Sequence, residues 1–357
     1  MKITVLYAGL AEPHAGWAAV DELAELIGAY FHAEILSTKK ATPPWPLNRF
    51  HQGKKFEPIE TAGGDVLIVI ARQPGGLAMI NGIANCRKKF GRIFGIVTDS
   101  YFRDGYMDET GLFDMITVTS HDDMAYPNKK FGVKVHQLYQ GADCLAWAPR
   151  TRKVRDIDII GFGRIPKNYH TRFTHCFHRA ESPYLYLHSP LGNLTGSSVH
   201  LERGMLFKVL QRTRISLAFN LFVETDGNRP RSMMVTSRWL ESLLAGCIVA
   251  GRRPVSRMAD EMLFWPGATI ELSENPEIAT EELNTLLADN DSMEEQRLVN
   301  ISQMIANHDW RHRIVEFSNM TGLPRPEMLS NDIEKLGELG ASFTKKAPGI
   351  HLREQLQ

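Results

Sequence analysis

One stretch of this chain, residues 215–251, constrains the possible fold more than any other. It begins with an apolar run, residues 215–222, that predicts a buried strand. A polar loop that contains the run Arg229-Pro230-Arg231 follows, and a second apolar run at residues 247–250 predicts the next buried strand. Between the loop and the second strand the sequence predicts a helix. Strand, loop, helix and strand in this order form half of a doubly wound nucleotide-binding domain.

The predicted helix begins at Thr236 or Ser237, because both residue types are good N-caps, and Gly246 suits its C-terminal end. Its apolar stripe consists of Trp239, Leu240, Leu243 and Leu244. Arg238 and Glu241 lie in the first turns of this helix. A cation and a carboxylate beside the backbone N–H groups of a helix N-terminus can hold a diphosphate and a ribose together. The helix therefore predicts a nucleotide-binding site.

The composition fits two soluble domains. The chain has 357 residues, enough for about two domains of roughly 150 residues each. Its 41 basic and 41 acidic residues cancel, so no net charge attracts nucleic acid or an anionic membrane. No apolar run is long enough to cross a bilayer, and the sequence begins without a signal-peptide pattern. The four cysteines are scattered and form no CxxC pair, as expected of reduced thiols in a cytoplasmic protein.

The first half alternates short apolar runs with helical patterns. This alternation predicts a parallel sheet with helices on both faces. The expected strands are residues 3–7, 65–71, 92–98, 113–119 and 133–139, and the expected helices are residues 17–30 and 77–90.

A second series of the same kind follows a basic linker at residues 146–155. Its expected strands are residues 158–162, 184–188, 215–222, 247–250 and 269–272. Its expected helices are residues 200–213, 237–245, 276–289, 293–307 and 310–321. The fold class is therefore α/β with two tandem Rossmann-like domains. We expect an acceptor-side domain at 1–150, a donor domain at 151–325, and a C-terminal helix or loose tail at 326–357.

Ligands of open α/β sheets bind at the carboxyl ends of the strands, so the residues that follow each predicted strand are the candidate site. In the first half, His14, Asp99 and His121 occupy such positions and suit acid/base chemistry or hydroxyl recognition. In the second half, Arg164 and Lys167 do so and suit a diphosphate.

Several motifs of the chain resemble the GT-B glycosyltransferases, in particular the group 1 enzymes similar to the spore-maturation protein CgeB. These motifs are FDMITVTSHDD with VKVHQLYQGADCLAWAP, IIGFGRIPKNYH, VTSRWLESLLAGCIVAG and ANHDWRHRIVEFSNM. The likeness covers roughly residues 1–325. It implies two Rossmann-like domains that face a central cleft, with a last helix that crosses back to the N-terminal domain.

The resemblance also implies roles for individual residues. Arg164, Lys167 and Arg238 would meet the diphosphate, Glu241 would bind the ribose hydroxyls, and the N–H groups at Thr236 and Ser237 would add phosphate contacts. Many retaining relatives carry a second glutamate eight residues before the ribose-binding one, where this chain has Met233. The sequence therefore leaves the donor sugar and the stereochemical outcome open.

The expected function is metal-independent transfer of a sugar, of hexosyltransferase type, from a nucleotide-diphosphate sugar to an acceptor hydroxyl. A UDP-sugar is the expected donor substrate, and no further cofactor is expected. Asp99, with His14 and His121, would supply the catalytic groups. The acceptor remains open among a glycan, a lipid-linked glycan, a small molecule and a modified nucleobase.

Three alternatives remain open: a nucleotide-sugar epimerase of the same fold, a nucleobase glucosyltransferase acting on modified DNA, and a non-catalytic sugar-nucleotide binding protein. Two other sites are disfavoured by spacing. The GFGRIP segment lacks the third glycine of a dinucleotide-binding motif, because Pro166 stands there. The cluster His170, His175, Cys176 and His178 matches no zinc template and is better explained as part of one helix.

Overall fold

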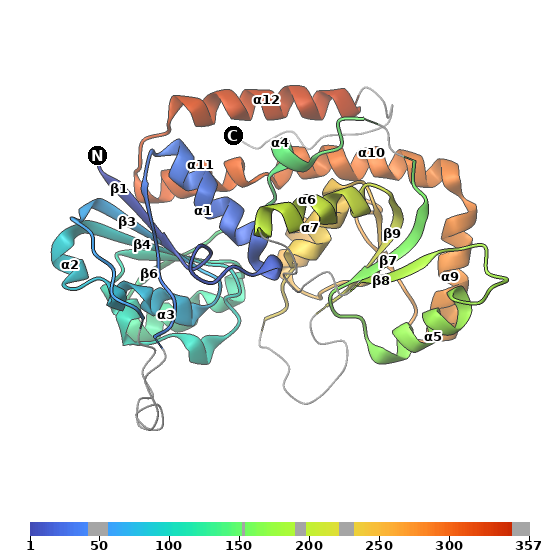
Figure 1. The fold of residues 1–357 in the computed structure, drawn as a ribbon, viewed down its shortest axis with the longest axis horizontal. Coiled ribbons are helices and arrows are strands. Elements are labelled where there is room, and N and C mark those ends of the chain that lie inside the picture. The colour runs from blue at the N-terminus through green and yellow to red at the C-terminus, as the bar shows by residue number, and fades with distance from the viewer. Residues whose placement is uncertain (42–55, 152–153, 190–197, 221–231, 345–357) are drawn as a thin grey trace. The chain divides into compact units, whose positions relative to one another are not determined.

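The computed structural model describes residues 1–41, 56–151, 154–189, 198–220 and 232–344 (Figure 1). The chain divides into two compact units. Unit 1 comprises residues 1–140, 230–232 and 313–330, and unit 2 comprises residues 141–229, 233–312 and 331–357. The predicted loop at Arg229–Arg231 and the tail at 345–357 lie outside the described residues. Each unit has its own parallel sheet, as the two series of apolar runs predicted.

The sheet of unit 1 has six parallel strands in the order β2-β1-β3-β4-β5-β6. Their bounds are β1 Ile3–Tyr7, β2 Glu34–Ser37, β3 Gly64–Ala71, β4 Phe90–Val97, β5 Met115–Val118 and β6 Lys134–Gln137. The central strands are mostly apolar because helices and turns cover both of their faces. Strand β2 was not predicted. It is a short, partly exposed edge strand, so its sequence EILS shows neither a long apolar run nor a strict alternation.

One predicted helix of unit 1, residues 77–90, is wrong. The segment instead forms a 3-10 helix, η3 Pro74–Gly82, and a single turn, α2 Cys86–Lys89, and β4 already begins at Phe90. Asn85 separates the two pieces with a φ of 54°, a left-handed conformation that interrupts a right-handed helix. Two further α-helices among residues 1–140 are α1 Ala18–Tyr30 and α3 Ala125–Phe131.

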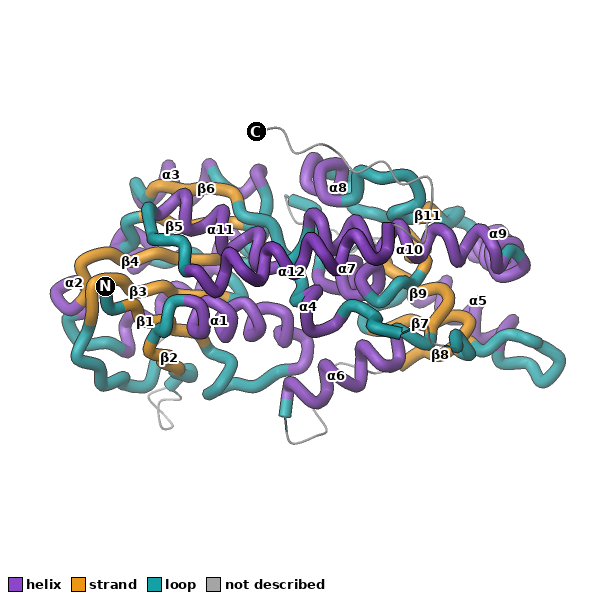
Figure 2. The backbone as a smooth tube through the Cα atoms, turned by 90° about the horizontal axis from the view of Figure 1, so that it is seen from above, coloured by secondary structure: helices purple, strands orange, loops and turns teal. Residues whose placement is uncertain are grey.

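The sheet of unit 2 has five parallel strands in the order β11-β10-β9-β7-β8. Their bounds are β7 Ile157–Phe162, β8 Tyr186–Ser189, β9 Thr213–Phe219, β10 Ile248–Arg252 and β11 Ile270–Glu271. The helices, seen from above in Figure 2, are α4 Cys144–Trp147, α5 Lys167–Phe177, α6 Val199–Leu210, α7 Ser237–Leu244, α8 Arg257–Met262, α9 Pro276–Ala288 and α10 Asn290–Asn307.

Helix α7 has the predicted position and orientation of its apolar face. Trp239, Leu240, Leu243 and Leu244 are all buried. The helix ends before Gly246, whose φ of 77° is favourable for glycine and costly for other residues. The next residues enter β10, which lies beside β9 in the sheet. The strand-loop-helix-strand unit predicted from residues 215–251 is therefore confirmed in the described parts.

Near its C-terminal end the chain returns to unit 1. Residues 313–330, which include most of α11 Trp310–Thr321, belong to unit 1. Phe317 packs edge-on against Phe94 of β4, with 6.1 Å between ring centroids. Arg92 donates a hydrogen bond from Nη1 to the carbonyl of Thr321 at 2.9 Å. The last helix, α12 Glu327–Thr344, begins in unit 1. From residue 331 on it belongs to unit 2, where its Asp332 lies 3.6 Å from Arg311.

Replacing either of two glycines by alanine should change the stability of the protein, in opposite directions. Gly251 in β10 has a φ of 152°, and a Cβ atom there would lie 1.9 Å from the carbonyl oxygen of Ala218. Gly251→Ala should therefore lower the unfolding free energy by roughly 2 kcal/mol or more, since backbone atoms cannot move aside cheaply. At Gly337 in α12, an added Cβ atom would have no neighbour within 4 Å. Gly337→Ala should raise stability by about 0.5–1 kcal/mol. Thermal unfolding of both variants tests this, and a Gly251→Ala protein as stable as the wild type contradicts it.

Candidate nucleotide-binding site

Two helix N-termini of unit 2 differ from the others. Five helices of this unit begin with a side chain that accepts a hydrogen bond from a first-turn N–H: Asp143, Ser198, Ser256, Asn275 and Asp289. Helix α5 begins after Pro166 and α7 begins after Thr236, and neither of these N-cap side chains makes such a bond. Thr236 thus has the predicted N-cap position without acting as a side-chain cap. In α5 the N–H of Tyr169 donates to Oδ1 of Asn168 at 2.9 Å. A helix start without a side-chain N-cap is suited to an external acceptor.

The two uncapped helices begin at the same edge of the sheet. Helix α5 follows β7 and α7 follows β9, and these two parallel strands are neighbours. Arg238, the second residue of α7, donates from Nη1 to the carbonyl of Arg164 at 3.0 Å, in the turn between β7 and α5. Both turns therefore meet at the carboxyl ends of the strands, where ligands of open α/β sheets bind.

Gly163 allows this close approach of Arg238. A Cβ atom at Gly163 would lie 2.3 Å from Arg238 Nη2, and the residue has a φ of 79°. The guanidinium also lies 5.7 Å from the ring centroid of Phe162. Burial, followed by the charge of Arg164, lowers the pKa of Arg238 to about 10, against the opposing effect of Glu241. Arg238 therefore keeps its charge at neutral pH, in surroundings that favour an anionic partner.

The structure brings the predicted donor residues together in unit 2. Arg164 is exposed in the turn after β7, and Lys167 is the first residue of α5. Ser237 and Arg238 open α7. Cations and helix N-termini at one place favour a ligand with two or more negative charges, such as a diphosphate.

Glu241 lies one turn further along α7 and is buried, with 6% of its surface exposed. Its Oε1 accepts a hydrogen bond from Nη1 of Arg203 in α6 at 2.6 Å. Arg203 is itself 3% exposed. Arg203 was not predicted from the sequence, because one arginine on a helix 38 residues earlier carries no local signal.

The three predicted catalytic residues all follow strands of unit 1. His14, after β1, is exposed, and its Nδ1 accepts a hydrogen bond from Gly16 N at 3.0 Å. Asp99 follows β4, and its backbone N–H donates to the carbonyl of Arg72 at 2.9 Å. His121 follows β5, and its ring lies 6.0 Å from that of Tyr139. Its Nδ1 is buried and has no hydrogen-bond partner among the described residues.

A second carboxylate at the same edge, Asp123, was not predicted from the sequence. It is fully buried and accepts hydrogen bonds from Ser100 Oγ at 2.7 Å and from Ser232 Oγ at 2.8 Å. Arg103 Nε lies 3.6 Å from its other oxygen. Burial raises the pKa of Asp123, while the two serines and Arg103 oppose that effect. Its neighbour Asp122 made the segment resemble an ordinary acidic turn.

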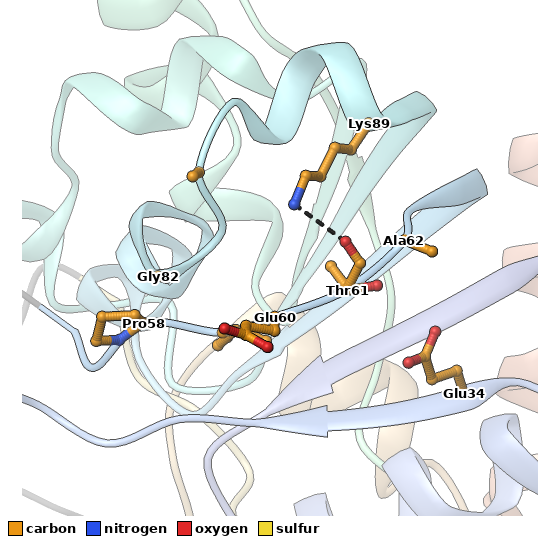
Figure 3. A pocket seen from close by; sticks show the side chains of 9 residues that line it. Glu34, Pro58, Glu60, Thr61, Ala62, Gly82 and Lys89 are labelled. Atoms are coloured by element: carbon orange, nitrogen blue, oxygen red, sulfur yellow. Dashed lines mark hydrogen bonds between the residues drawn. The ribbon is translucent and has the colours of Figure 1, made fainter.

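A separate cavity lies at the opposite edge of the unit 1 sheet. A cavity of about 580 Å³ in unit 1 is lined by residues that include Glu34, Glu60 and Lys89, and Lys89 donates to the carbonyl of Thr61 (Figure 3). Glu34 begins β2 and Lys89 precedes β4, so this cavity lies at the amino ends of the strands.

Within the described ranges, no group of three or more His, Cys, Asp or Glu residues is placed to hold a metal ion. No helix in the described part of the chain is long and apolar enough to span a membrane.

The chain is similar to several known proteins. Residues 184–319 match the family described as glycosyl transferase-like. The structure of HepE (Alr3699) from Anabaena in complex with UDP-glucose aligns with a TM-score of 0.54, 8% identity and coverage of 90% of this chain and 100% of that one. Its complex with UDP gives a TM-score of 0.52, 10% identity and the same coverage. A glycosyltransferase from Rickettsia africae aligns at a TM-score of 0.46 and 9% identity, over 95% and 98% of the two chains.

The chain has the GT-B fold and carries a glycosyl transferase-like domain. The matched region runs from the residues before β8 to α11 and so contains α6, α7 and the Arg203–Glu241 pair. The resemblance to GT-B glycosyltransferases predicted from the sequence motifs is confirmed. A search of curated protein sequences found no match.

The raised pKa of Asp123 predicts a specific pH dependence of stability in this GT-B protein. In the folded chain Asp123 keeps its proton to a higher pH than in the unfolded chain, where a carboxyl group titrates near pH 4. Between those two pKa values the folded state binds more protons, so the contribution of Asp123 to the unfolding free energy falls as pH rises. The Asp123→Asn variant has no carboxyl group at this position, so its unfolding free energy does not fall for this reason as pH rises. The stability of the variant relative to the wild type should therefore improve from about pH 4 upwards.

Thermal unfolding midpoints of the two proteins between pH 4 and pH 8 measure the difference. Asp122→Asn, next to Asp123 and exposed, serves as the matched control. Parallel pH profiles of the wild type and Asp123→Asn would show that Asp123 titrates alike in both states and would contradict the prediction.

Proposed function

We propose that this protein transfers a sugar from a nucleotide-diphosphate sugar to an acceptor hydroxyl without the help of a metal ion. The observation that carries the proposal is the meeting of two uncapped helix N-termini, of α5 and α7, beside Arg238 and Arg164. A UDP-sugar is the proposed donor. Support comes from HepE, a protein of the same fold whose structures contain UDP and UDP-glucose.

The proposed chemistry follows from the movement of charge. As the bond between the anomeric carbon and the β-phosphate oxygen breaks, its electron pair stays on the diphosphate. Arg238, Arg164 and Lys167, with the N–H groups of the two helices, would stabilise this leaving group electrostatically. Such fixed cations can take the part that a divalent metal plays in other transferases.

The acceptor hydroxyl must lose a proton as it attacks the anomeric carbon. We propose Asp99 as the general base, because it follows β4 at the carboxyl edge of the unit 1 sheet. His14 and His121 are the other proposed catalytic groups at that edge. The buried Nδ1 of His121 has a hydrogen-bonding capacity that no described residue uses, which supports a role in binding a polar ligand.

A panel of labelled UDP-, GDP- and dTDP-sugars, with product analysis, tests the function. Release of UDP together with sugar transfer to water or to an added acceptor is the expected result, and its rate should be unchanged in EDTA. Epimerised sugar nucleotide without transfer contradicts the proposal, as does saturable binding of the donor without turnover. Loss of activity in EDTA overturns its metal-independent part.

Arg238 supplies the sharpest binding test of the donor site. Arg238→Met keeps an unbranched, flexible side chain but removes the guanidinium and its charge. UDP should therefore bind about tenfold more weakly or worse, the usual size of a lost charged hydrogen bond. Arg212→Met is the matched control, because Arg212 pairs with Asp156 at the amino end of β9. Titration calorimetry measures both. Equal UDP affinity of wild type and Arg238→Met would remove Arg238 from the site.

A further inference from the structure

The ion pair between Arg203 and Glu241 joins two helices of unit 2. Arg203 lies on α6 and Glu241 on α7, and the side chains are 2% and 8% exposed. Their 2.6 Å hydrogen bond uses Oε1 of the carboxylate. The other oxygen, Oε2, has no hydrogen-bond partner among the described residues. One half of the carboxylate is therefore held, and the other half remains an acceptor.

Aromatic packing holds the arginine of this pair in place. The Arg203 guanidinium carbon lies 5.1 Å from the ring centroid of Phe207, one turn further along α6. The Phe207 ring stacks on Trp147 of α4, with a centroid separation of 4.9 Å and an interplanar angle of 1°. Gln211 donates to the carbonyl of Trp147 at 2.9 Å and fixes the base of this stack. The Arg203 side chain is therefore held from its aromatic side as well as by Glu241.

Folding stability alone is a poor explanation for such a pair. The desolvation of two buried charges offsets most of their attraction, and well-packed apolar side chains of the same size serve a core equally well. A buried carboxylate can instead accept hydrogen bonds from hydroxyl groups. An arginine that binds one of its oxygens fixes its orientation and leaves the other oxygen available as the acceptor. The ribose of a nucleotide offers two neighbouring hydroxyls.

We propose that Arg203 is a positioning residue for ribose recognition. Its hydrogen bond orients the Glu241 carboxylate so that Oε2 accepts hydrogen bonds from the ribose hydroxyls. The inference rests on the proposed function, because it places the nucleotide of the donor beside α7. The inference adds Arg203 to the proposed donor site, although this residue lies outside the phosphate-binding turns. The preference for nucleotides with ribose hydroxyls then depends on helix α6.

The test compares UDP with 2′,3′-dideoxy-UDP, which differ only in the ribose hydroxyls. Wild-type protein should bind UDP about tenfold more tightly or better, as expected for hydrogen bonds to a charged acceptor. Arg203→Met should reduce this ratio to about threefold or less, because the carboxylate loses the group that orients it. Arg203→Lys keeps the charge and should restore part of the ratio. Glu241→Gln should reduce the ratio as Arg203→Met does, and the double variant should lose little more.

The ratio of the affinity for UDP to that for 2′,3′-dideoxy-UDP distinguishes a positioning role of Arg203 from a purely structural one. General damage to the fold weakens both nucleotides alike and leaves the ratio unchanged. Arg214→Met is the matched control, because Arg214 forms a partly buried pair with Asp158 near the amino end of β9. If circular dichroism shows that Arg203→Met is unfolded, Arg203→Lys carries the test, and a ratio equal to that of the wild type refutes the inference.

The remaining outcomes are distinct. Wild-type protein that binds neither nucleotide overturns the proposed function itself. Wild-type protein that prefers UDP, together with an Arg203→Met variant that keeps the full preference, overturns the role of Arg203 and leaves the function standing. Equal binding of both nucleotides by the wild type removes the ribose contact, and the inference with it.

Discussion

The hydrogen bond from Arg238 to the carbonyl of Arg164 holds together the proposed nucleotide-binding site. It ties the start of α7 to the turn between β7 and α5, and so brings two helix N-termini to one place. Glycine at position 163 leaves room for the guanidinium in this place, since an added Cβ atom would lie 2.3 Å from Arg238 Nη2. The site thus depends on a residue with no side chain as much as on its charged residues. The partial positive charges of the helices and the full charge of Arg238 reinforce one another because the strands below them are parallel neighbours.

Much of the fold could be predicted from the sequence because buried parallel strands are nearly continuous apolar runs. Strand β1 and helix α11 have the predicted bounds, and most other elements differ from theirs by one to three residues at either end. The errors occur where local pattern is not decisive. Strand β2 is too short and too exposed to show a period, and the break at Asn85 depends on a backbone conformation that side-chain periodicity does not encode. Helix α8 was missed for a similar reason, since six residues are too few for a convincing helical stripe.

The candidate site was predictable only in part, because sequence shows positions along strands but not pairings between distant elements. Arg164, Arg238 and Glu241 stand out as polar residues directly after strands or at a helix start. Arg203 and Asp123 do not, because their importance comes from partners that lie 38 and 109 residues away. A buried charge is recognisable only when its burial is known. The absent side-chain caps of α5 and α7 are likewise visible only in the structure, and Thr236 shows why: the residue type fits a cap, yet its hydroxyl makes no such bond.

The return of residues 313–330 to unit 1 has a consequence for biosynthesis. Translation releases the first 140 residues well before Phe317 and Thr321, which cover Phe94 and bind Arg92. During that interval the sheet of unit 1 lacks part of its apolar covering, although its six strands are already synthesised. Unit 2 has most of its sequence available before unit 1 is complete, the reverse of the usual order in which N-terminal domains finish first. A ribosome-bound chain of this protein would therefore expose this apolar surface of unit 1 until residues 313–330 have been synthesised.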